Sequence, residues 1–484
     1  MCVWPSWRWQ HLRQDRAQKE IKMEMENFKG KKVLIVGIGK TGFSLINFFN
    51  RLECEIRVTD IKPIFDLNKS VKKIKKIEPT PEMTFGEHKD EDFLEADVIV
   101  YSAAINPSLP QLELARSKGK EVYSDFALAY KLCKKPIIAV CGSYGRTTIA
   151  SMIGFTLKID GKNTFVGGTS DMPFIEYCML SNVNEIDYVV VEVSALQMKS
   201  LPDFHPKIVV LPNIGENFSK AQFSSVSEYM ETKLSIVSKL THDDVLVSNY
   251  DSLANNAAIR NAACQTYWYS RRSFVALGVM NEIQGTHFHD RRIHSNINYH
   301  SEFKVNKMRI VGQNNRENLM AAVTTCKALD VSDEAIQTCI EKFPGIPNRL
   351  EFIMEKNGVC FYNDSKAETM PEMIESLKSF KEPVILIAGG KDNEDLNFEP
   401  FAKDMIGNAR VLVLVGECKE RLNRALGDHN QTYIVGSFEE SVLFAYQKSR
   451  TGDVILLSPG NPASDFFRDF EERGNYFKKL VYQL

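Results

Sequence analysis

The sequence contains no long apolar segment and no closely paired cysteines. Its apolar runs are of strand length, as in residues 384–388, and none approaches the roughly 20 residues that a membrane-spanning helix needs. Ten cysteines are scattered over 484 residues without a Cys-x-x-Cys pair, which is typical of a reducing compartment and not of a disulfide framework. We therefore expect a cytoplasmic protein without a membrane span.

An excess of charge of one sign is missing as well. The chain has 60 Lys and Arg residues against 62 Asp and Glu residues, which leaves a formal net charge of −2. Nucleic acids and anionic membrane surfaces attract strongly basic proteins, so this balance argues against both as partners. Hydrophobic residues at 44% and charged residues at 25% describe a globular protein that is long enough for two to four domains.

The first residues do not match the composition of the rest. Trp4, Trp7 and Trp9 are mixed with Arg and Gln, and no apolar segment of a secretory signal follows them. Met25, just before the first expected strand, is a more natural beginning. We predict that residues 1–29 form a disordered N-terminal extension; an aromatic and basic membrane-surface tag is the less favoured alternative.

From Lys31 onward, apolar runs of strand length alternate with helical patterns, which predicts an α/β fold. We expect three domains: a Rossmann-like domain over residues 30–135, a central phosphate-loop domain with a parallel sheet over residues 136–346, and a second Rossmann-like domain over residues 347–484. The expected strands cover residues 33–36, 56–60, 98–101, 121–123, 137–141, 188–192, 207–211, 384–388, 411–415, 432–435 and 454–457.

A nucleotide-binding fingerprint follows the first strand. Gly37, Gly39 and Gly42 form a G-x-G-x-x-G pattern, and Asp60 ends the next strand about 20 residues further on. Glycines at this spacing allow the backbone to approach a phosphate, while the carboxylate can bind a ribose. Alone, this pattern suggests NAD and an oxidoreductase, a hypothesis that leaves the rest of the chain unexplained.

A second glycine-rich loop lies between the apolar run 137–141 and a helical pattern that begins at Ile149. Strand, glycine-rich turn and helix form the cradle that holds nucleotide phosphates, because the loop amides and the helix N-terminus attract anions. Thr147 stands where a hydroxyl would bind Mg²⁺, but Arg146 replaces the usual lysine and the first glycine of the strict pattern is missing. The loop consists of Gly142, Ser143, Tyr144, Gly145, Arg146, Thr147 and Thr148.

Polar residues follow two strands of the expected central sheet. Glu192 ends the strand over residues 188–192, and Asn213 follows the strand over residues 207–211. Because ligands gather at the carboxyl ends of parallel strands, we expect both side chains to face the phosphate loop. An amphipathic helix further on carries Tyr229 and Lys233.

Three histidines, His287, His289 and His294, lie in a less regular stretch between residues 273 and 310. Their spacing could bind a metal ion. Solvated histidines on a surface β-ribbon are the more frequent arrangement, and we expect that one here.

Five blocks follow one another along the chain: Glu192-Val-Ser-Ala-Leu-Gln197, Gly312-Gln-Asn-Asn-Arg-Glu-Asn318, Ile346-Pro-Asn-Arg349, Asn363-Asp-Ser-Lys-Ala367 and Phe470-Glu-Glu-Arg-Gly474. The fourth block matches the pattern N-D-S-K-A outright, and the others are similar to E-x-S-S-F-Q, G-Q-H-N-x-x-N, P-H-R and F-E-x-R-G. In these blocks and their order the chain resembles the Mur ligases, and within them the D-glutamate-adding type, over nearly all of residues 31–484.

The resemblance implies an ATP-dependent, amide-bond-forming ligase that acts on a UDP-muramoyl precursor through an acyl phosphate. Such transfer depends mainly on positioning and on charge neutralisation. The phosphate loop would hold ATP. Thr147, Glu192 and a carbamylated Lys233 would serve Mg²⁺, with Lys233, Glu192 and Arg146 as the catalytic residues. Further ATP contacts are implied for Asn315, Asn318, Arg349 and Asp364.

The resemblance also implies small-molecule substrates and a monomer. The uridine nucleotide would lie on the N-terminal fingerprint, and the incoming amino acid would lie in the C-terminal domain. The implied uridine-binding residues are Gly39, Lys40, Thr41, Asp60 and Ile61, and the implied amino-acid-binding residues are Lys366, Glu368, Ser464 and Phe470.

Some positions depart from the family pattern. Arg146 is longer and planar, so it does not replace the loop lysine conservatively. The family's E-D-H segment reads Glu216-Asn217-Phe218 here, and phenylalanine cannot bind Mg²⁺. Glu368 puts a carboxylate where a dicarboxylate substrate should dock. A diverged homologue that binds the UDP precursor as a scaffold or regulator is therefore the alternative hypothesis.

Overall fold

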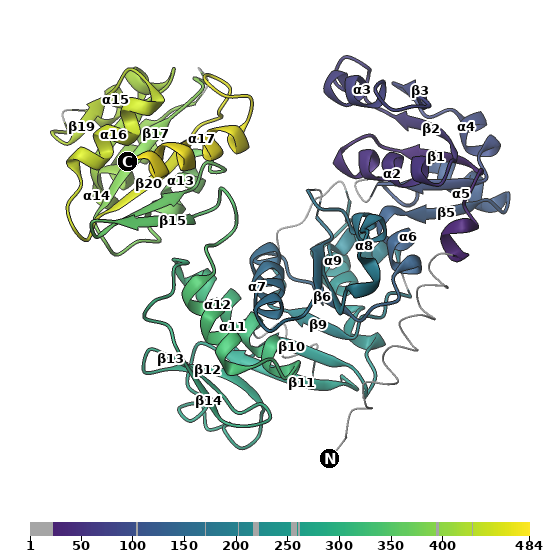
Figure 1. Cartoon of the computed structure of the whole chain (residues 1–484), viewed down its shortest axis with the longest axis horizontal. Coiled ribbons are helices and arrows are strands. Elements are labelled where there is room, and N and C mark those ends of the chain that lie inside the picture. The colour runs from purple at the N-terminus through teal and green to yellow at the C-terminus, as the bar shows by residue number, and fades with distance from the viewer. Residues whose placement is uncertain are drawn as a thin grey trace. The chain divides into compact units, whose positions relative to one another are not determined.

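Three β-sheets organise the chain (Figure 1). The protein is represented by a computed structural model, which describes residues 23–102, 105–169, 171–201, 203–215, 222–252, 259, 262–393, 396–427 and 429–484.

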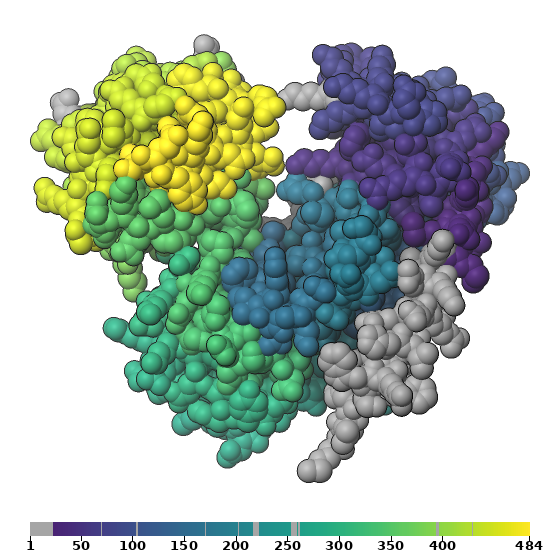
Figure 2. Space-filling view, in the orientation of Figure 1, coloured from purple at the N-terminus to yellow at the C-terminus, as the bar shows by residue number. Residues whose placement is uncertain are grey.

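The first sheet has five parallel strands in the order β3-β2-β1-β4-β5. The order reverses beside β1, and in such sheets ligands bind at the carboxyl ends of the strands next to that point. In the space-filling view these elements form a purple-to-blue lobe (Figure 2). The strands are β1 (Lys32–Val36), β2 (Glu55–Asp60), β3 (Glu82–Phe85), β4 (Val98–Tyr101) and β5 (Glu121–Ser124), and the helices are α2 (Lys40–Arg51), α3 (Asn68–Ile74), α4 (Asp90–Glu95), α5 (Pro110–Ser117) and α6 (Asp125–Leu132).

The central sheet has nine strands in the order β14-β13-β12-β11-β10-β9-β6-β8-β7. The pairs from β7 to β12 are parallel, and β12 pairs with β13 antiparallel. Near-continuous Val and Ile runs in β6, β8 and β9 fit strands that are buried on both faces. The strands are β6 (Ile137–Val140), β7 (Thr164–Gly167), β8 (Tyr188–Glu192), β9 (Ile208–Leu211), β10 (Val245–Asn249), β11 (Gln265–Ser270), β12 (Gly285–His289), β13 (Arg292–Ser295) and β14 (Ser301–Lys304).

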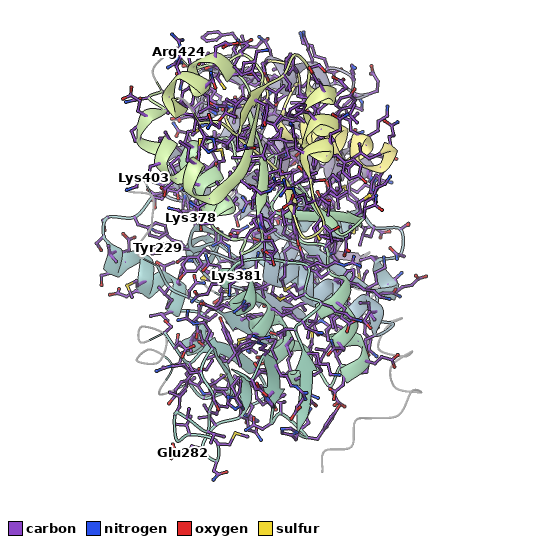
Figure 3. The ribbon with its side chains drawn as sticks, turned by 90° about the vertical axis from the view of Figure 1, so that its left-hand side faces the viewer. Tyr229, Glu282, Lys378, Lys381, Lys403 and Arg424 are labelled. Carbon is purple, nitrogen blue, oxygen red and sulfur yellow. The ribbon has the colours of Figure 1, made fainter. Side chains whose placement is uncertain are left out.

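Helices and short 3-10 segments accompany the central sheet. Within this part of the chain, Tyr229 on α9 and Glu282, in the turn before β12, lie far apart (Figure 3). The α9 region and the β12–β14 end of the sheet are therefore separate places. The helices are α7 (Arg146–Ile159), α8 (Ala195–Ser200), α9 (Val226–Leu234), α11 (Gln313–Ala328) and α12 (Asp333–Lys342), and the 3-10 segments are η1 (Phe174–Met179), η2 (Val183–Glu185) and η3 (Val237–Lys239).

The third sheet has six strands in the order β15-β16-β20-β17-β18-β19, parallel except for the β15–β16 pair at one edge. Apolar residues pack against both faces of the sheet. The strands are β15 (Glu351–Lys356), β16 (Val359–Asn363), β17 (Val384–Gly389), β18 (Ala409–Val415), β19 (Thr432–Ile434) and β20 (Val454–Gly460), and the helices are α13 (Met370–Leu377), α14 (Glu399–Asn408), α15 (Lys419–Leu426), α16 (Phe438–Lys448) and α17 (Phe470–Gln483).

By compactness the chain forms two units. The first comprises residues 1–303 and 320–336, and the second comprises residues 304–319 and 337–484. The first two sheets share the first unit and one apolar core, in which Phe126 lies 5.2 Å from Phe174 and 5.3 Å from Phe204 between ring centroids. The three predicted domains correspond to the three sheets and not to these two units. Their boundaries stay a prediction.

The expected strands are confirmed to within a few residues, but the helix expected from Ile149 begins earlier. Helix α7 begins at Arg146, because Gly145 before it has φ +82° and permits the sharp turn out of the loop. The expected extension over residues 1–29 was too long at its end, since Phe28 is 2% exposed and belongs to the core of the first unit. Residues 1–22 lie outside the described part.

Candidate functional site

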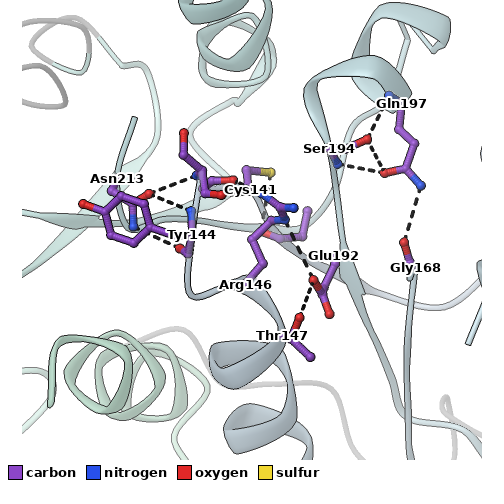
Figure 4. A network of polar contacts seen from close by, with 12 residues as sticks. Cys141, Tyr144, Arg146, Thr147, Gly168, Glu192, Ser194, Gln197 and Asn213 are labelled. Atoms are coloured by element: carbon purple, nitrogen blue, oxygen red, sulfur yellow. Dashed lines mark hydrogen bonds and ion pairs between the residues drawn. The ribbon is translucent and has the colours of Figure 1, made fainter. Parts of the chain in front are cut away.

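The phosphate loop connects the carboxyl end of β6 to helix α7 (Figure 4). Gly145 has φ +82°, in the left-handed region that glycine adopts without strain, and it precedes the first turn of α7. A Cβ on Gly142 would lie 2.7 Å from Cγ of Pro212, so the loop needs glycine there to pack against the β9 loop. The first amides of a helix have no partner within it and attract anions, so the start of α7 brings positive potential to the loop.

Asn213 holds the outer part of the loop in place. Its Oδ1 accepts hydrogen bonds from the backbone amides of Ser143 (2.9 Å) and Tyr144 (3.1 Å), and its Nδ2 donates to the Tyr144 carbonyl oxygen at 3.0 Å. The expectation that Asn213 faces the loop is therefore correct. Because these two amides already have a partner, an anion on the loop would have to use the amides closer to α7.

Thr147 and Glu192 bring two oxygen ligands together beside the loop. The Thr147 hydroxyl donates to Oε2 of Glu192 at 3.0 Å. Glu192 ends β8, whose pairing with β6 sets Glu192 opposite Val140. A hydroxyl and a carboxylate at this distance are ligand types that Mg²⁺ prefers, so the pair fits that ion.

Arg146 does not point freely into the site. Its guanidinium donates to the loop carbonyl oxygens of Gly142 and Ser143, the latter at 3.1 Å, and its Nε lies 3.8 Å from Oε2 of Glu192. The positive charge of Arg146 therefore balances Glu192 and the loop carbonyls.

Lys233, on α9, lies in an environment that is unusual for a lysine. Its side chain is 1% exposed, and its Nζ donates to the Gly142 carbonyl oxygen at 2.5 Å and lies 5.1 Å from the centroid of the Tyr229 ring. Burial, and then the charge of Arg146, lowers the pKa of Lys233 to about 7. Near neutral pH, much of this amine is uncharged and can act as a nucleophile.

The N-terminal fingerprint forms a separate site at the end of β1. Oδ2 and Oδ1 of Asp60 accept hydrogen bonds from the amides of Ile38 and Lys62, both at 3.0 Å. The chain before α2 is tightly packed, since a Cβ on Gly42 would lie 2.1 Å from the Gly37 carbonyl oxygen.

The other residues expected at this site surround the start of α2. Lys40 makes an ion pair with Asp171 at 2.5 Å, and Ile61 is 57% exposed. Gly39 and Thr41 lie on either side of Lys40. The five residues expected to bind uridine therefore come from the turn at α2 and from the end of β2.

In the second unit, Asp364 is buried at the end of β16. Its Oδ1 accepts from the Leu350 amide at 3.1 Å, its Oδ2 accepts from the Ser458 hydroxyl at 2.8 Å, and burial raises its pKa to about 6. Arg349 is exposed in the adjoining turn. Nζ of Lys366 lies 5.2 Å from the centroid of the Phe470 ring.

Glu368 has partners that the sequence did not reveal. Its Oε1 accepts from the Ala463 amide at 3.1 Å, next to the exposed Ser464, and lies 3.6 Å from Nη2 of Arg473. Arg473 is 2% exposed, and burial lowers its pKa to about 10. Sequence reasoning treated Glu368 as an unbalanced carboxylate and missed Arg473, whose only signal was the arginine of the F-E-x-R-G block.

The two asparagines of α11 form a local pair. Nδ2 of Asn318 donates to Oδ1 of Asn315 at 3.2 Å, and Nδ2 of Asn315 donates to the Val311 carbonyl oxygen at 2.8 Å. The segment Glu216-Asn217-Phe218, which departs from the family pattern, lies outside the described residues.

The expected β-ribbon around the histidines exists, but the expectation of solvated rings is wrong for His287. Strands β12 and β13 pair antiparallel with His287 opposite His294. His287 is 4% exposed, because Phe274 covers it at 4.7 Å between ring centroids. Burial is the main reason why its pKa falls to about 4.

A glycine-rich loop between a parallel strand and a helix, with a threonine, a glutamate and a buried lysine beside it, defines a class of α/β nucleotide-phosphate-binding proteins. Three family models match this chain: a MurD-like Mur ligase N-terminal domain over residues 31–124, a Mur ligase middle domain over residues 140–326, and a Mur ligase glutamate ligase domain over residues 348–461. The chain belongs to the Mur ligase family, whose members are ATP-dependent ligases.

Full-length relatives agree with this assignment. The chain is 35% identical over 462 residues to a protein of Bdellovibrio bacteriovorus, with 95% of this chain and 98% of the relative covered, and 32% identical to one of Alkaliphilus metalliredigens, with 96% and 99% covered. Both are named UDP-N-acetylmuramoylalanine–D-glutamate ligase. The N-terminal fingerprint thus lies in a Mur ligase domain, and the oxidoreductase hypothesis has no support.

Solved structures show the same fold. The chain matches a UDP-N-acetylmuramoyl-L-alanyl-D-glutamate–2,6-diaminopimelate ligase with a TM-score of 0.58 and 15% identity, over 80% of this chain and 92% of the other. It also matches a UDP-N-acetylmuramate–alanine ligase from Thermotoga maritima with a TM-score of 0.54 and 16% identity, over 94% and 99%. The three-domain α/β architecture expected from the sequence is confirmed.

Proposed function

We propose that this chain is an ATP-dependent ligase that joins D-glutamate to UDP-N-acetylmuramoyl-L-alanine, the activity that the names of its full-length relatives describe. The observation that carries the proposal is the cluster of Thr147, Glu192 and Lys233 around the phosphate loop. In the reaction, a substrate carboxylate oxygen attacks the γ-phosphorus of ATP, which releases ADP. The amine of the amino acid then attacks the carbonyl carbon of the acyl phosphate, and phosphate leaves as the amide bond forms.

The residues of the loop would act mainly by positioning and by offsetting charge. The N-terminus of α7 and Arg146 bring positive potential to the phosphates. Thr147 and Glu192 would hold Mg²⁺, which neutralises phosphate charge when bound. Lys233 has a neutral amine that can attack CO₂ and lose a proton, so that it becomes a carbamate and an additional anion for the metal.

The roles of the remaining expected residues are part of the same proposal. The turn at α2 and the end of β2 would bind the uridine nucleotide, and the second unit would bind the amino acid and part of ATP. The uridine contacts are Gly39, Lys40, Thr41, Asp60 and Ile61; the amino-acid contacts are Lys366, Glu368, Ser464 and Phe470; the additional ATP contacts are Asn315, Asn318, Arg349 and Asp364.

Phosphate release is the experiment that tests this function. The full chain is incubated with ATP, Mg²⁺, UDP-N-acetylmuramoyl-L-alanine and each of a panel of amino acids, with L-glutamate as the matched control for D-glutamate. We expect release with D-glutamate and little with its enantiomer. Release with a different amino acid would refute the proposed substrate. UDP-precursor binding without any release would instead support the scaffold alternative, which none of the comparisons favours.

The partners, the cellular compartment and the oligomeric state are proposed from the charge, the cysteines and the helices of the chain. The net charge of −2 does not favour nucleic acid as a partner. The nine cysteines among the described residues are all unpaired, which suits a reducing compartment. No helix of the described part is long and apolar enough to cross a membrane. We propose a cytoplasmic monomer that acts on small molecules.

A further inference from the structure

A cluster of imidazole and carboxylate groups lies on the β-ribbon at the far edge of the central sheet, where the proposed ligase chemistry uses none of them. His294 is on β13, Glu302 is on β14, and His300 lies just before β14. The ligand atoms of the three side chains all lie within 4.8 Å of one another. From β13 to β6 is five strand spacings of about 4.8 Å, or roughly 24 Å, so the cluster is separate from the phosphate loop.

Two of the three groups already have the spacing of metal ligands. Nδ1 of His294 lies 3.5 Å from Oε1 of Glu302. Two ligand atoms at about 2.0–2.1 Å from a tetrahedral Zn²⁺ ion lie about 3.3 Å apart. The third ligand, His300, is exposed, so its side chain can close the remaining distance without disturbing the sheet.

Contacts on the outer side of His294 and Glu302 leave one ligand atom of each side chain close to the other. Nε2 of His294 lies 3.3 Å from the His289 carbonyl oxygen. A proton on that nitrogen leaves the Nδ1 lone pair toward Glu302, which is the arrangement that histidine ligands of metals use. Arg292 donates to Oε2 of Glu302 at 2.6 Å, which fixes the carboxylate and leaves Oε1 for a ligand.

A buried histidine, His287, lies beside the cluster. The His287 ring stacks on the His294 ring, with centroids 5.3 Å apart and planes 13° apart. Among the described residues, none forms a hydrogen bond with Nδ1 of His287, although this atom is buried. His287 therefore adds a third imidazole beside the site, although it is not among the three groups whose ligand atoms lie within 4.8 Å of one another.

We propose that His294, His300 and Glu302 form a binding site for a divalent transition metal of the Zn²⁺ class, with His287 as a neighbouring imidazole. Two imidazoles and one carboxylate suit Zn²⁺ and its neighbours, whereas Mg²⁺ and Ca²⁺ prefer oxygen ligands only. Three protein ligands leave a fourth position for water. The segment that carries the site lies at the edge of the first unit, where Figure 1 labels β12, β13 and β14.

Calorimetric titration with ZnCl₂ alone tests the site. The full chain is freed of metal with EDTA, and excess MgCl₂ is added so that oxygen-rich sites such as Thr147 and Glu192 are occupied. We expect one equivalent of Zn²⁺ to bind, and its affinity to fall at least about tenfold in H294A, H300A and E302Q, the loss typical of altered metal ligation. His242, which is exposed and outside the cluster, serves as the matched control in H242A.

Cobalt provides a second measurement that does not depend on heat. Replacement of Zn²⁺ by Co²⁺ should give the intense visible absorption of a four-coordinate ion, and H300A should lose it. Because His300 and Glu302 are exposed, their variants should fold. Zn²⁺ binding that is absent in the presence of Mg²⁺, or equally strong in wild type and H300A, would overturn the proposal. Neither outcome bears on the ligase activity, so the two proposals fail separately.

Discussion

At the residue scale, Lys233 shows how a tertiary environment changes an ordinary side chain. A lysine on an amphipathic helix is usually exposed and charged. Here the amine is buried and donates to the Gly142 carbonyl oxygen. Burial and the nearby charge of Arg146 together lower its pKa to about 7. An uncharged amine is the form that can bind CO₂, so the geometry is compatible with the carbamate that the family resemblance implies.

We expect Lys233→Ala to abolish nearly all turnover, because it removes the proposed anion beside the metal. Bicarbonate should support the wild type and not the variant. Since the amine loses its proton as the pH rises through about 7, a ¹³C-bicarbonate carbamate signal should be stronger at pH 8 than at pH 6. The exposed Lys162 provides the matched control, Lys162→Ala. Full activity in Lys233→Ala would refute the carbamate role.

The pairing of Glu368 with Arg473 leads to a second prediction at this scale. A dicarboxylate substrate would have to compete with Glu368 for the positive charge of Arg473. Glu368→Gln keeps an oxygen that can accept from the Ala463 amide and removes the negative charge. Arg473 retains its bonds to Ser365 and Asn461, so the fold should survive.

We therefore expect the KM for D-glutamate to fall several-fold in Glu368→Gln in the phosphate-release assay. Glu372→Gln, an exposed change in the first turn of α13, should leave it unchanged. A KM that rises in Glu368→Gln would show that the carboxylate helps to build the pocket instead of opposing the substrate.

At the scale of elements, the two strand–turn–helix units carry most of the site. Each unit contains a glycine that lies too close to neighbouring atoms to carry a side chain. Not every glycine of these turns lacks room for a Cβ, so the packing shows which of them can be replaced. A Cβ on Gly42 would collide with the Gly37 carbonyl oxygen at 2.1 Å, whereas a Cβ on Gly39 would meet no atom within 4 Å.

We expect Gly42→Ala to destabilise the first unit by about 1–3 kcal/mol, the usual cost of forcing extra atoms into a packed site, and to weaken binding of the UDP precursor. Gly39→Ala is the control, and its stability should stay within about 0.5 kcal/mol of the wild type. Urea unfolding of the two variants makes the comparison. Equal stability would show that the start of α2 can shift to accommodate a methyl group.

The phosphate loop leads to a prediction about turnover. Arg146 is held by the loop carbonyl oxygens and lies near Glu192, so it reaches the phosphates less freely than a lysine would. We expect Arg146→Lys combined with Phe218→His to raise kcat, since the pair restores a mobile charge and a possible metal ligand. A wild type with an ordinary kcat of about 1–10³ s⁻¹ and no gain in the double variant would show that both substitutions are compensated.

At the scale of the whole molecule, two compact units with separate apolar cores should unfold with some independence. Phe28 belongs to the first core, where its ring centroid lies 6.0 Å from that of Phe49.

We expect Phe28→Ala to lower the melting temperature of the first unit's transition in a calorimetric scan, at a cost of about 3–5 kcal/mol, and to leave the second transition in place. Removal of residues 1–22, for which the sequence predicts no core-facing pattern, is the comparison and should change the melting temperature little. A drop of several degrees after that removal would contradict the predicted extension.

The sequence by itself determined the features that depend on short segments. The strand ends, the two glycine-rich turns and each single family block are local patterns, because glycine spacing and apolar runs act within about 20 residues. They were sufficient for the α/β class, the family and the expected position of Glu192 and Asn213.

Only the tertiary structure decided what the side chains touch across the chain. Lys233 meets a carbonyl oxygen 91 residues away, Arg473 meets Ser365 108 residues away, and His287 lies under Phe274 and not in solvent. Burial and non-local partners set the pKa values of these groups, and no local pattern encodes them. For this reason the family resemblance identified Lys233 and Glu368 as site residues. It did not reveal that the pKa of Lys233 is lowered to about 7, or that Arg473 balances the charge of Glu368.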